Sequence, residues 1–239
     1  MKRTLTTLLG TIALLLTLAV GAWALPTFPV QAGSTVKMFA NDTAIQYEGH
    51  YQAVNTKTNA DFGVFCLEII EYFTPYTPNN PKTYTVKDVV GYAANGGRGG
   101  QTENNKDYIS DSTKWLYYHF MLEDLDNITN IDESDYSLQL AIWFLEDELK
   151  GNDVEGRKDY YTNQYYTNTL AQKYVEVSKA NATENNYSDY VKVMNLVDSN
   201  GNVAQSQLIG AAPVPEPSTF ILLGIGLLGA GLVRRKFGK

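Results

Sequence analysis

Apolar and polar residues alternate through the first third of the chain, as they do in strands that bury one face. Between Thr35 and Glu68 this alternation predicts several strands. The positions assigned to one face are Ile45, Tyr47, Gly49 and Tyr51. The segment Phe62–Ile70 is more continuously apolar and predicts a mostly buried strand that carries Cys66, and Thr83–Val90 predicts one more short strand.

The middle of the chain changes to a helical period. One helix is expected to begin near Asp111 or Ser112, either of which is a good N-cap, with Trp115, Leu116, His119 and Phe120 on one side. A second is expected from Ser134 to Lys150, stopped by Gly151, with a core stripe of Leu138, Ile142, Leu145 and Leu149. A third, rich in tyrosine, is expected between Lys158 and Ser178.

The remaining pattern completes the predicted fold. The glycine-rich stretch Gly91–Asp107 indicates a loop, and it lacks the lysine that a phosphate-binding loop places directly after its glycines. Near the end, Tyr190–Val197 and Val203–Ile209 flank a turn-rich segment and predict a hairpin, after which a linker starts at Gly210. Strands, then helices, then strands predict an α+β fold: a β-sandwich or barrel with an inserted or packed helical lobe.

The N-terminus has the pattern of an export signal. Lys2 and Arg3 precede an apolar stretch from Leu8 to Val20, which ends at the small-residue site Ala22-Trp23-Ala24. Residues 1–24 are therefore predicted to be a signal peptide that signal peptidase removes. The alternative, a retained anchor, is disfavoured because the stretch is shorter than the ~20 residues of a membrane span.

The C-terminus combines a proline-rich motif, an apolar segment and a basic cluster. Pro215-Glu216-Pro217 precedes the apolar segment Phe220–Val233, and Arg234, Arg235 and Lys236 follow it. The apolar segment predicts a membrane-spanning helix, and the basic cluster predicts that its end stays cytoplasmic. This arrangement resembles the PEP-CTERM sorting signal. The resemblance implies that an exosortase processes residues 214–239 and passes the protein to the cell surface or extracellular matrix; an ordinary tail anchor is the alternative.

The net charge of the predicted ectodomain, residues 25–213, disfavours some classes of binding partner. Six of the 19 lysines and arginines lie in the two ends, whereas only Glu216 of the 26 acids does, so the ectodomain carries 13 basic and 25 acidic residues, a net charge of −12. Such acidity disfavours nucleic acid and anionic membrane surfaces as partners.

Cys66 is the only cysteine, so the exported chain cannot form an internal disulfide. Gln139 lies near the start of the second predicted helix, where unpaired N–H groups and the helix dipole favour negative charge on a carbonyl oxygen. A sulfur nucleophile and a carboxamide held together away from water can form a thioester with loss of ammonia. Trp143, one turn after Gln139, is expected to shield such a bond.

The sequences Phe65-Cys66-Leu67-Glu68 and Leu138-Gln139-Leu140-Ala141-Ile142-Trp143 resemble the paired motifs of Cys-Gln thioester domains in bacterial surface adhesins. The resemblance implies a spontaneous bond between Cys66 and Gln139, which the amine of a surface ligand, typically a lysine, attacks to leave an amide on Gln139. It therefore implies a single-turnover covalent binder in adhesion or biofilm matrix crosslinking, with no cofactor, no metal and no enzymatic turnover. Leu138 departs from the threonine usual in the adhesin motif.

Two further residues are candidate supporting groups. Glu68, two residues after Cys66, could accept a proton during bond formation, although an exposed or ion-paired surface carboxylate is the expectation preferred for it. His119 could act as a general base, although a structural histidine is preferred. A non-reactive structural protein of the extracellular matrix and a secreted cysteine hydrolase that uses Cys66 and His119 remain the alternatives.

Overall fold

The structure is a computed structural model. It describes residues 26–40, 50–69, 71, 74–94, 101–104, 106–129, 134–149, 157–182 and 187–211. The predicted signal peptide, the PEP-CTERM segment with its predicted membrane helix, and three of the four strand positions expected on one face (Ile45, Tyr47 and Gly49) lie outside these residues. Within them, no helix has both the length and the apolar character needed to cross a membrane. The elements that follow belong to one unit, Phe28–Ala212.

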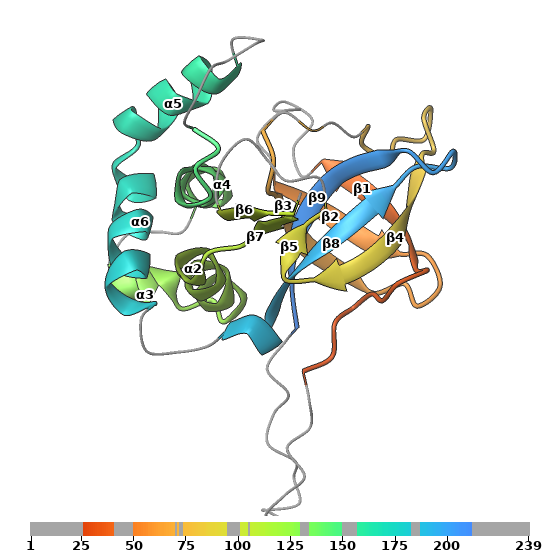
Figure 1. The fold of residues 1–239 in the computed structure, drawn as a ribbon, viewed down its shortest axis with the longest axis horizontal. Coiled ribbons are helices and arrows are strands. Elements are labelled where there is room, and N and C mark those ends of the chain that lie inside the picture. Colours follow the sequence, from red (N-terminus) through yellow and green to blue (C-terminus); the bar gives the residue numbers. More distant parts are fainter. Residues whose placement is uncertain are drawn as a thin grey trace, which may run out of the picture. The chain divides into compact units, whose positions relative to one another are not determined.

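Six antiparallel strands close into a barrel, which decides between the two predicted β architectures (Figure 1). In barrel order they are β1 (Thr35–Ala40), β2 (His50–Asn55), β3 (Asp61–Cys66), β9 (Val203–Gly210), β8 (Val191–Val197) and β4 (Thr83–Val90), and β4 pairs back with β1. The expected strand at Thr83–Val90 and the expected final hairpin are confirmed. Inward positions are filled by apolar side chains, including Val36, Met38, Ala53, Val64 and Val86, all buried.

The glycine-rich stretch is more structured than the predicted loop. Its described residues form a small antiparallel sheet of β5 (Tyr92–Ala93), β7 (Lys106–Tyr108) and β6 (Gln101–Glu103). The expectation of a loop was wrong here because these strands have two or three residues each, too few for a period of two to become visible.

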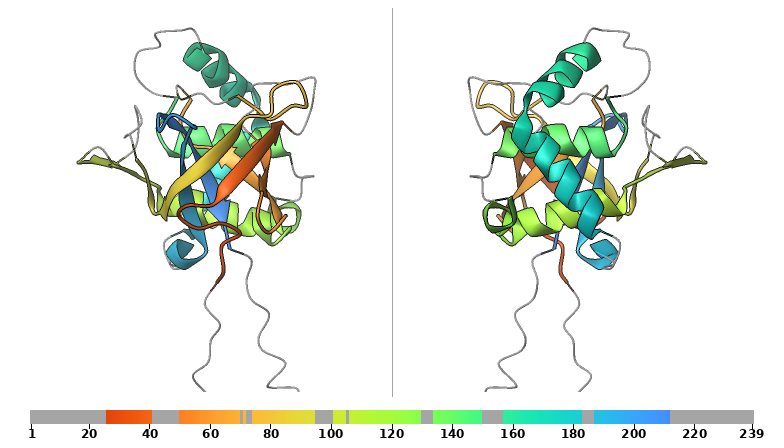
Figure 2. Two further views of the ribbon diagram at one scale, coloured as in Figure 1. Left: turned by 90° about the vertical axis from the view of Figure 1, so that its right-hand side faces the viewer. Right: turned by 90° about the vertical axis from the view of Figure 1, so that its left-hand side faces the viewer.

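The helical lobe lies beside the barrel and between its strands in the sequence (Figure 2). It contains α2 (Asp111–Met121), α3 (Leu125–Thr129), α4 (Asp135–Leu145), α5 (Arg157–Thr167) and α6 (Thr169–Asn181). The expected tyrosine-rich helix is two helices, because the Asn168 side chain accepts from Ala171 N at 2.9 Å and caps a new helix. Ser110 and Ser134 cap α2 and α4 in the same way. Helix α3 was not predicted from the sequence.

Helix α4 ends earlier than expected, and its ending matters for the site. It stops at Leu145 rather than Lys150. Asp147 adopts a left-handed conformation with φ of 62°, while Glu148 N donates to Trp143 O at 2.9 Å and Asp147 N to Phe144 O at 3.3 Å. These bonds form a Schellman motif, in which an aspartate replaces the usual glycine. The chain therefore turns back at Asp147, and Glu148 and Leu149 enter the interior.

Gly210 allows the barrel and helical lobe to approach closely. A Cβ atom at this position would lie 2.9 Å from a ring carbon of Tyr117 and would overlap the end of Met121, both on α2. The Tyr117 hydroxyl also donates to the carbonyl of Gly63 on β3 at 2.9 Å. Glycine here lets α2 pack against the end of β9 and the middle of β3, where Gly63 lies.

Candidate functional site

Cys66 is the last residue of β3 and is buried, with 2% of its surface exposed. On one side, β3 pairs with β9: Phe65 lies opposite Leu208, Cys66 opposite Gln207, and Leu67 N donates to Ser206 O at 3.2 Å. On the other side, the described pairing with β2 ends at Phe65, opposite His50. The N–H and C=O of Cys66 therefore point to the β2 side of β3, one residue beyond the last described β2–β3 pair. They need another hydrogen-bond partner there.

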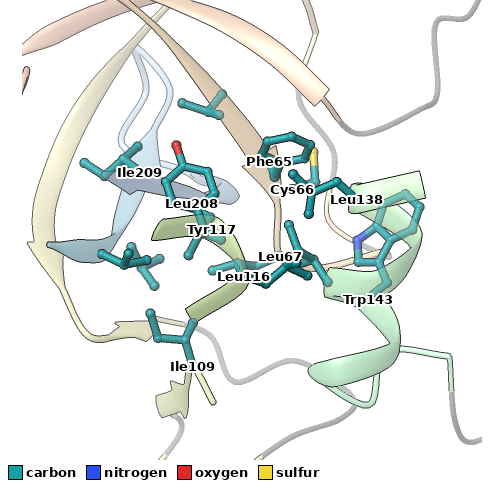
Figure 3. Packing of buried hydrophobic residues seen from close by; sticks show 14 of the residues in the cluster. Phe65, Cys66, Leu67, Ile109, Leu116, Tyr117, Leu138, Trp143, Leu208 and Ile209 are labelled. Atoms are coloured by element: carbon teal, nitrogen blue, oxygen red, sulfur yellow. The ribbon is translucent and has the colours of Figure 1, made fainter. Parts of the chain in front are cut away.

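Gln139 supplies that partner. Cys66 N–H donates to Gln139 Oε1 at 2.9 Å, and Gln139 Nε2 donates to the Cys66 carbonyl oxygen at 2.8 Å. Gln139 is fully buried on α4, and its carboxamide takes the place that a neighbouring strand would occupy. The structure thus brings together the two residues that the sequence singled out, although they are 73 positions apart. Figure 3 shows Cys66 beside the helix that carries Leu138 and Trp143.

The sulfur of Cys66 points toward two other glutamines, both on β9. The thiol donates to Gln205 Oε1 at 2.9 Å, and Gln207 Nε2 lies 3.5 Å from the sulfur. Gln207 is directly opposite Cys66 in the ladder and Gln205 is its diagonal neighbour, so all three side chains share one face. Gln205 Nε2 also donates to the carbonyl of Glu68 at 2.6 Å, which fixes the chain just beyond the cysteine.

The thiol is held in its protonated form. Burial raises the pKa of Cys66 strongly, the hydrogen bond from Gln207 opposes that rise, and the charge of Glu71 adds to it. A thiol of this kind is a poor nucleophile toward molecules in solution, because the thiolate is the reactive form. Any reaction of Cys66 must therefore start with a group already held beside it inside the protein.

Trp143 lies one turn after Gln139 and is 3% exposed. Its indole packs against Tyr161 of α5, with ring centroids 4.7 Å apart. Aromatic side chains in such a layer exclude water from the residues beneath them. The shielding role expected of Trp143 stays a prediction.

Glu68 is buried, so the preferred expectation of a surface carboxylate was wrong. It is 2% exposed, and its Oε2 has no hydrogen-bond partner among the described residues. Carboxylate oxygens of Glu68, Asp107 and Glu148 all lie within 4.8 Å of one another. Burial is the main cause that raises the pKa of Glu68 to about 10, and the charge of Glu148 is the next. In the described part of the chain this is the one group of acids whose spacing suits a metal ion.

A second buried acid nearby has a different environment. Glu146 is 3% exposed, and its Oε1 accepts from the Ser110 hydroxyl at 2.8 Å and from Ser110 N at 3.1 Å. Burial raises the pKa of Glu146, whereas the hydrogen bonds from Thr113 and Ser110 lower it. Glu146 therefore connects the end of α4 to the start of α2, which explains why a carboxylate is tolerated there.

His119 makes its contacts away from the cysteine. Its Nδ1 lies 2.9 Å from Asp124 Oδ1, and its ring packs on Trp115 with centroids 4.2 Å apart. None of the hydrogen bonds described for Cys66 involves it. The structural role preferred for His119 fits this geometry, and the arrangement required of a cysteine hydrolase, with base and nucleophile in hydrogen-bond contact, is not formed between these described residues.

Sequence reasoning missed Gln205, Gln207, Asp107 and Glu148. Gln205 and Gln207 alternate on a predicted hairpin, which usually indicates an outward polar face, yet both are buried. Their spacing of two residues, on a predicted strand, was the signal available in the sequence. Asp107 and Glu148 could not be found because they lie in the segments whose secondary structure was predicted wrongly or to the wrong length.

Comparisons with known proteins agree with the sequence motifs. Residues 213–236 match the family model described as the PEP-CTERM protein-sorting motif, which implies export and handling by an exosortase. The sorting signal expected at Pro215-Glu216-Pro217 with Arg234 and Arg235 is thereby confirmed, although it lies outside the described structure.

Among solved structures, the chain is similar to two domains from Streptococcus pyogenes. One is the N-terminal thioester domain of fibronectin-binding protein SfbI, with 18% identity, a TM-score of 0.47, and coverage of 80% of this chain and 98% of that one. The other is the N-terminal domain of the pilus tip adhesin Cpa, with 11% identity, a TM-score of 0.48, and coverage of 81% and 100%. A comparison with curated proteins finds no match.

Proposed function

We propose that this protein is a surface-sorted, non-enzymatic binder in which Cys66 and Gln139 form an internal thioester that captures amines covalently. The observation that carries the proposal is the pair of hydrogen bonds between the Gln139 carboxamide and the Cys66 backbone, at 2.9 and 2.8 Å, in a buried setting. A carboxamide fixed on the backbone of a buried cysteine is the arrangement that the proposed bond requires.

The same hydrogen bonds prepare the carboxamide for attack. Cys66 N–H donates to Oε1, so it polarises the carbonyl and stabilises the oxyanion that forms when sulfur adds to Cδ. The Cys66 carbonyl accepts from Nε2, so it orients the leaving nitrogen. We propose that rotation about the Cα–Cβ bond of Cys66 moves the sulfur from Gln205 to the Gln139 carbon.

Bond formation then balances without a cofactor. The bond between Cys66 Sγ and Gln139 Cδ forms, the bond between Cδ and Nε2 breaks, and the thiol proton transfers to nitrogen, which leaves as ammonia. Gln205 Oε1 accepts a hydrogen bond from the Cys66 thiol and so holds the thiol proton in place before the transfer. The high pKa of the thiol is compatible with this route because sulfur and proton are never exposed to bulk solvent.

In the capture of a ligand, the sulfur of Cys66 is the leaving group instead of the nucleophile. The amine of a surface ligand, such as a protein lysine, attacks Gln139 Cδ, the carbon–sulfur bond breaks, and the amine proton returns to Cys66. The product is a stable amide on Gln139, so each molecule reacts once. We propose that Trp143, packed against Tyr161, limits hydrolysis of the bond before a ligand arrives.

The division of the chain follows from the same proposal. Residues 1–24 direct export and are removed by signal peptidase, residues 25–213 form the reactive ectodomain, and residues 214–239 form the sorting signal. The apolar segment of that signal anchors the protein transiently in the membrane until an exosortase acts on it. The ectodomain then functions at the cell surface or in the extracellular matrix, in adhesion or biofilm crosslinking.

Methylamine incorporation tests this function. We expect the purified full chain, kept soluble with a mild nonionic detergent, to take up one methylamine per molecule and to expose one free thiol as it does so. Cys66→Ala and Gln139→Ala should each abolish uptake. Gln172→Ala is the matched control, because Gln172 binds only carbonyls of α5 and should leave uptake unchanged. Equal uptake by Gln139→Ala and the control would overturn the proposal.

A further inference from the structure

The carboxylates of Glu68, Asp107 and Glu148 come from three separate elements. Glu68 follows the end of β3, Asp107 lies in β7, and Glu148 follows the Schellman turn that ends α4. All three are buried, with 2%, 4% and 3% of their surfaces exposed, and their oxygens lie within 4.8 Å of one another. Three like-charged groups in one interior site repel one another unless a proton or a cation compensates them.

One atom of this cluster lacks a compensating contact. Glu68 Oε2 is buried and has no hydrogen-bond partner among the described residues. Leaving a buried acceptor without a partner is unfavourable, and native proteins rarely do so without a bound ion or water. Of the causes that shift the pKa of Glu68, each one raises it, and every charged neighbour among them is another acid. Within the described part of the chain, no lysine or arginine is among the groups that influence this carboxyl.

We propose that Glu68, Asp107 and Glu148 bind a calcium ion. Calcium prefers oxygen ligands at about 2.3–2.6 Å, so two oxygens on opposite sides of one ion are separated by roughly 4.6–5.2 Å. The spacing within the cluster lets all three carboxylates reach a single ion without movement of the backbone. Magnesium requires shorter distances of about 2.0–2.1 Å and keeps several waters, which fits a dry cluster less well.

The ion would connect the two elements that carry the candidate thioester. Glu68 is two residues from Cys66, and Glu148 lies just beyond the helix that positions Gln139. Binding of one ion to both therefore fixes the distance between the end of β3 and the end of α4. Calcium binding itself does not require the thioester, so it can be measured in Cys66→Ser, in which the Cys66–Gln139 thioester cannot form.

Thermal unfolding and calorimetry test the site. The full chain in mild detergent is first treated with a chelator and then titrated with calcium chloride. We expect its Tm to rise with calcium concentration by mass action, and calorimetry to give one ion per molecule, in Cys66→Ser as well as in the unaltered protein. Absence of any calcium-dependent rise would overturn the proposal, and a response to magnesium chloride alone would overturn the choice of calcium.

Isosteric variants separate binding from general electrostatics. Glu68→Gln and Glu148→Gln should lose the calcium-dependent rise, with affinity lower by more than about tenfold, because each removes a charged ligand. In chelator neither should unfold at a lower temperature than the unaltered protein, because a neutral amide of the same shape cannot repel the other acids of the cluster. Glu176→Gln, which alters an exposed acid paired with Lys173, is the control and should keep the full rise. The same rise in all three variants would show only diffuse attraction of calcium to an acidic protein and would contradict the proposal.

Discussion

Two groups of buried polar side chains lie beside the end of β3, and they differ in how well their hydrogen bonds are satisfied. Around Cys66, the carboxamides of Gln139 and Gln205 bind backbone groups at 2.6 to 2.9 Å. Two residues further on, Glu68 faces two other carboxylates and has an oxygen for which the described residues offer no partner. Both groups are buried, so exposure does not explain the difference.

The difference follows from the chemistry of the two side chains. An amide carries both donor and acceptor, so a cluster of glutamines can pair with the backbone and with one another and stay neutral. A carboxylate only accepts, so a cluster of acids needs protons or a cation from elsewhere. The glutamine group therefore needs no further ligand and suits a reaction without water, whereas the acidic group, as far as the described residues go, needs protons or the proposed cation.

The largest expected effect is on stability when Gln139 is removed. Gln139→Ala leaves the N–H and C=O of Cys66 buried without partners, at about 1–3 kcal/mol each, so we expect a loss of roughly 3 kcal/mol or more in the free energy of unfolding. The measurement is urea denaturation in a Cys66→Ser background, so that no covalent bond contributes. Gln172→Ala should cost less than about 1 kcal/mol. Equal losses would mean that the Gln139 contacts contribute little.

A smaller effect should distinguish the two glutamines of β9. Gln205 makes hydrogen bonds at 2.9 and 2.6 Å, whereas the contacts of Gln207 with Cys66 are 3.5 and 3.8 Å long. Because both are buried and leave similar cavities, Gln205→Ala should be less stable than Gln207→Ala by about 1–2 kcal/mol in urea denaturation. The opposite order would show that the sulfur is held mainly by Gln207.

The two buried glutamates near the end of α4 should respond in opposite directions. In chelator, Glu148→Gln should leave stability unchanged or raise it slightly, because it removes one of the mutually repelling charges. Glu146→Gln should lower stability by about 1 kcal/mol, because the amide cannot fully replace the charge-assisted bonds with Ser110. Chemical denaturation of the two variants at one pH provides the comparison, and a loss in both would remove the distinction between the two environments.

The smallest expected effect concerns His119. Its contacts with Asp124 and Trp115 lie outside the glutamine group, so His119→Gln should leave methylamine uptake unchanged and cost less than about 1 kcal/mol of stability. Uptake rates measured across a range of pH would detect any role as a base. A loss of uptake with normal stability would instead favour the hydrolase-like arrangement.

Much of the fold followed from periodicity. Thr83–Val90, the final hairpin, and helices beginning close to Ser110 and at Ser134 were predictable, because each shows a clear alternation or a capping residue. Barrel closure was not, since it depends on pairing between β4 and β1 rather than on either strand alone. The early end of α4 was also hidden, because Asp147 adopts a left-handed conformation that sequence patterns assign to glycine.

The candidate site was predictable only in its two central residues. Cys66 and Gln139 could be singled out because their motifs resemble a known pair and because the chain has one cysteine. The sequence could not show that the Gln139 side chain would bind the backbone N–H and C=O of Cys66. Those groups are available only because the described pairing of β2 with β3 ends one residue earlier. The burial of Glu68 was missed for a related reason: its neighbours Asp107 and Glu148 are distant in sequence.

The most direct test of the account is mass spectrometry of the purified full chain, first intact and then after proteolysis without reducing agent. A thioester between Cys66 and Gln139 predicts a protein lighter than its sequence by one ammonia, a crosslinked peptide pair that contains both residues, and methylamine located on Gln139. A protein of full mass with an unmodified thiol, or methylamine located on Gln205 or Gln207, would contradict it.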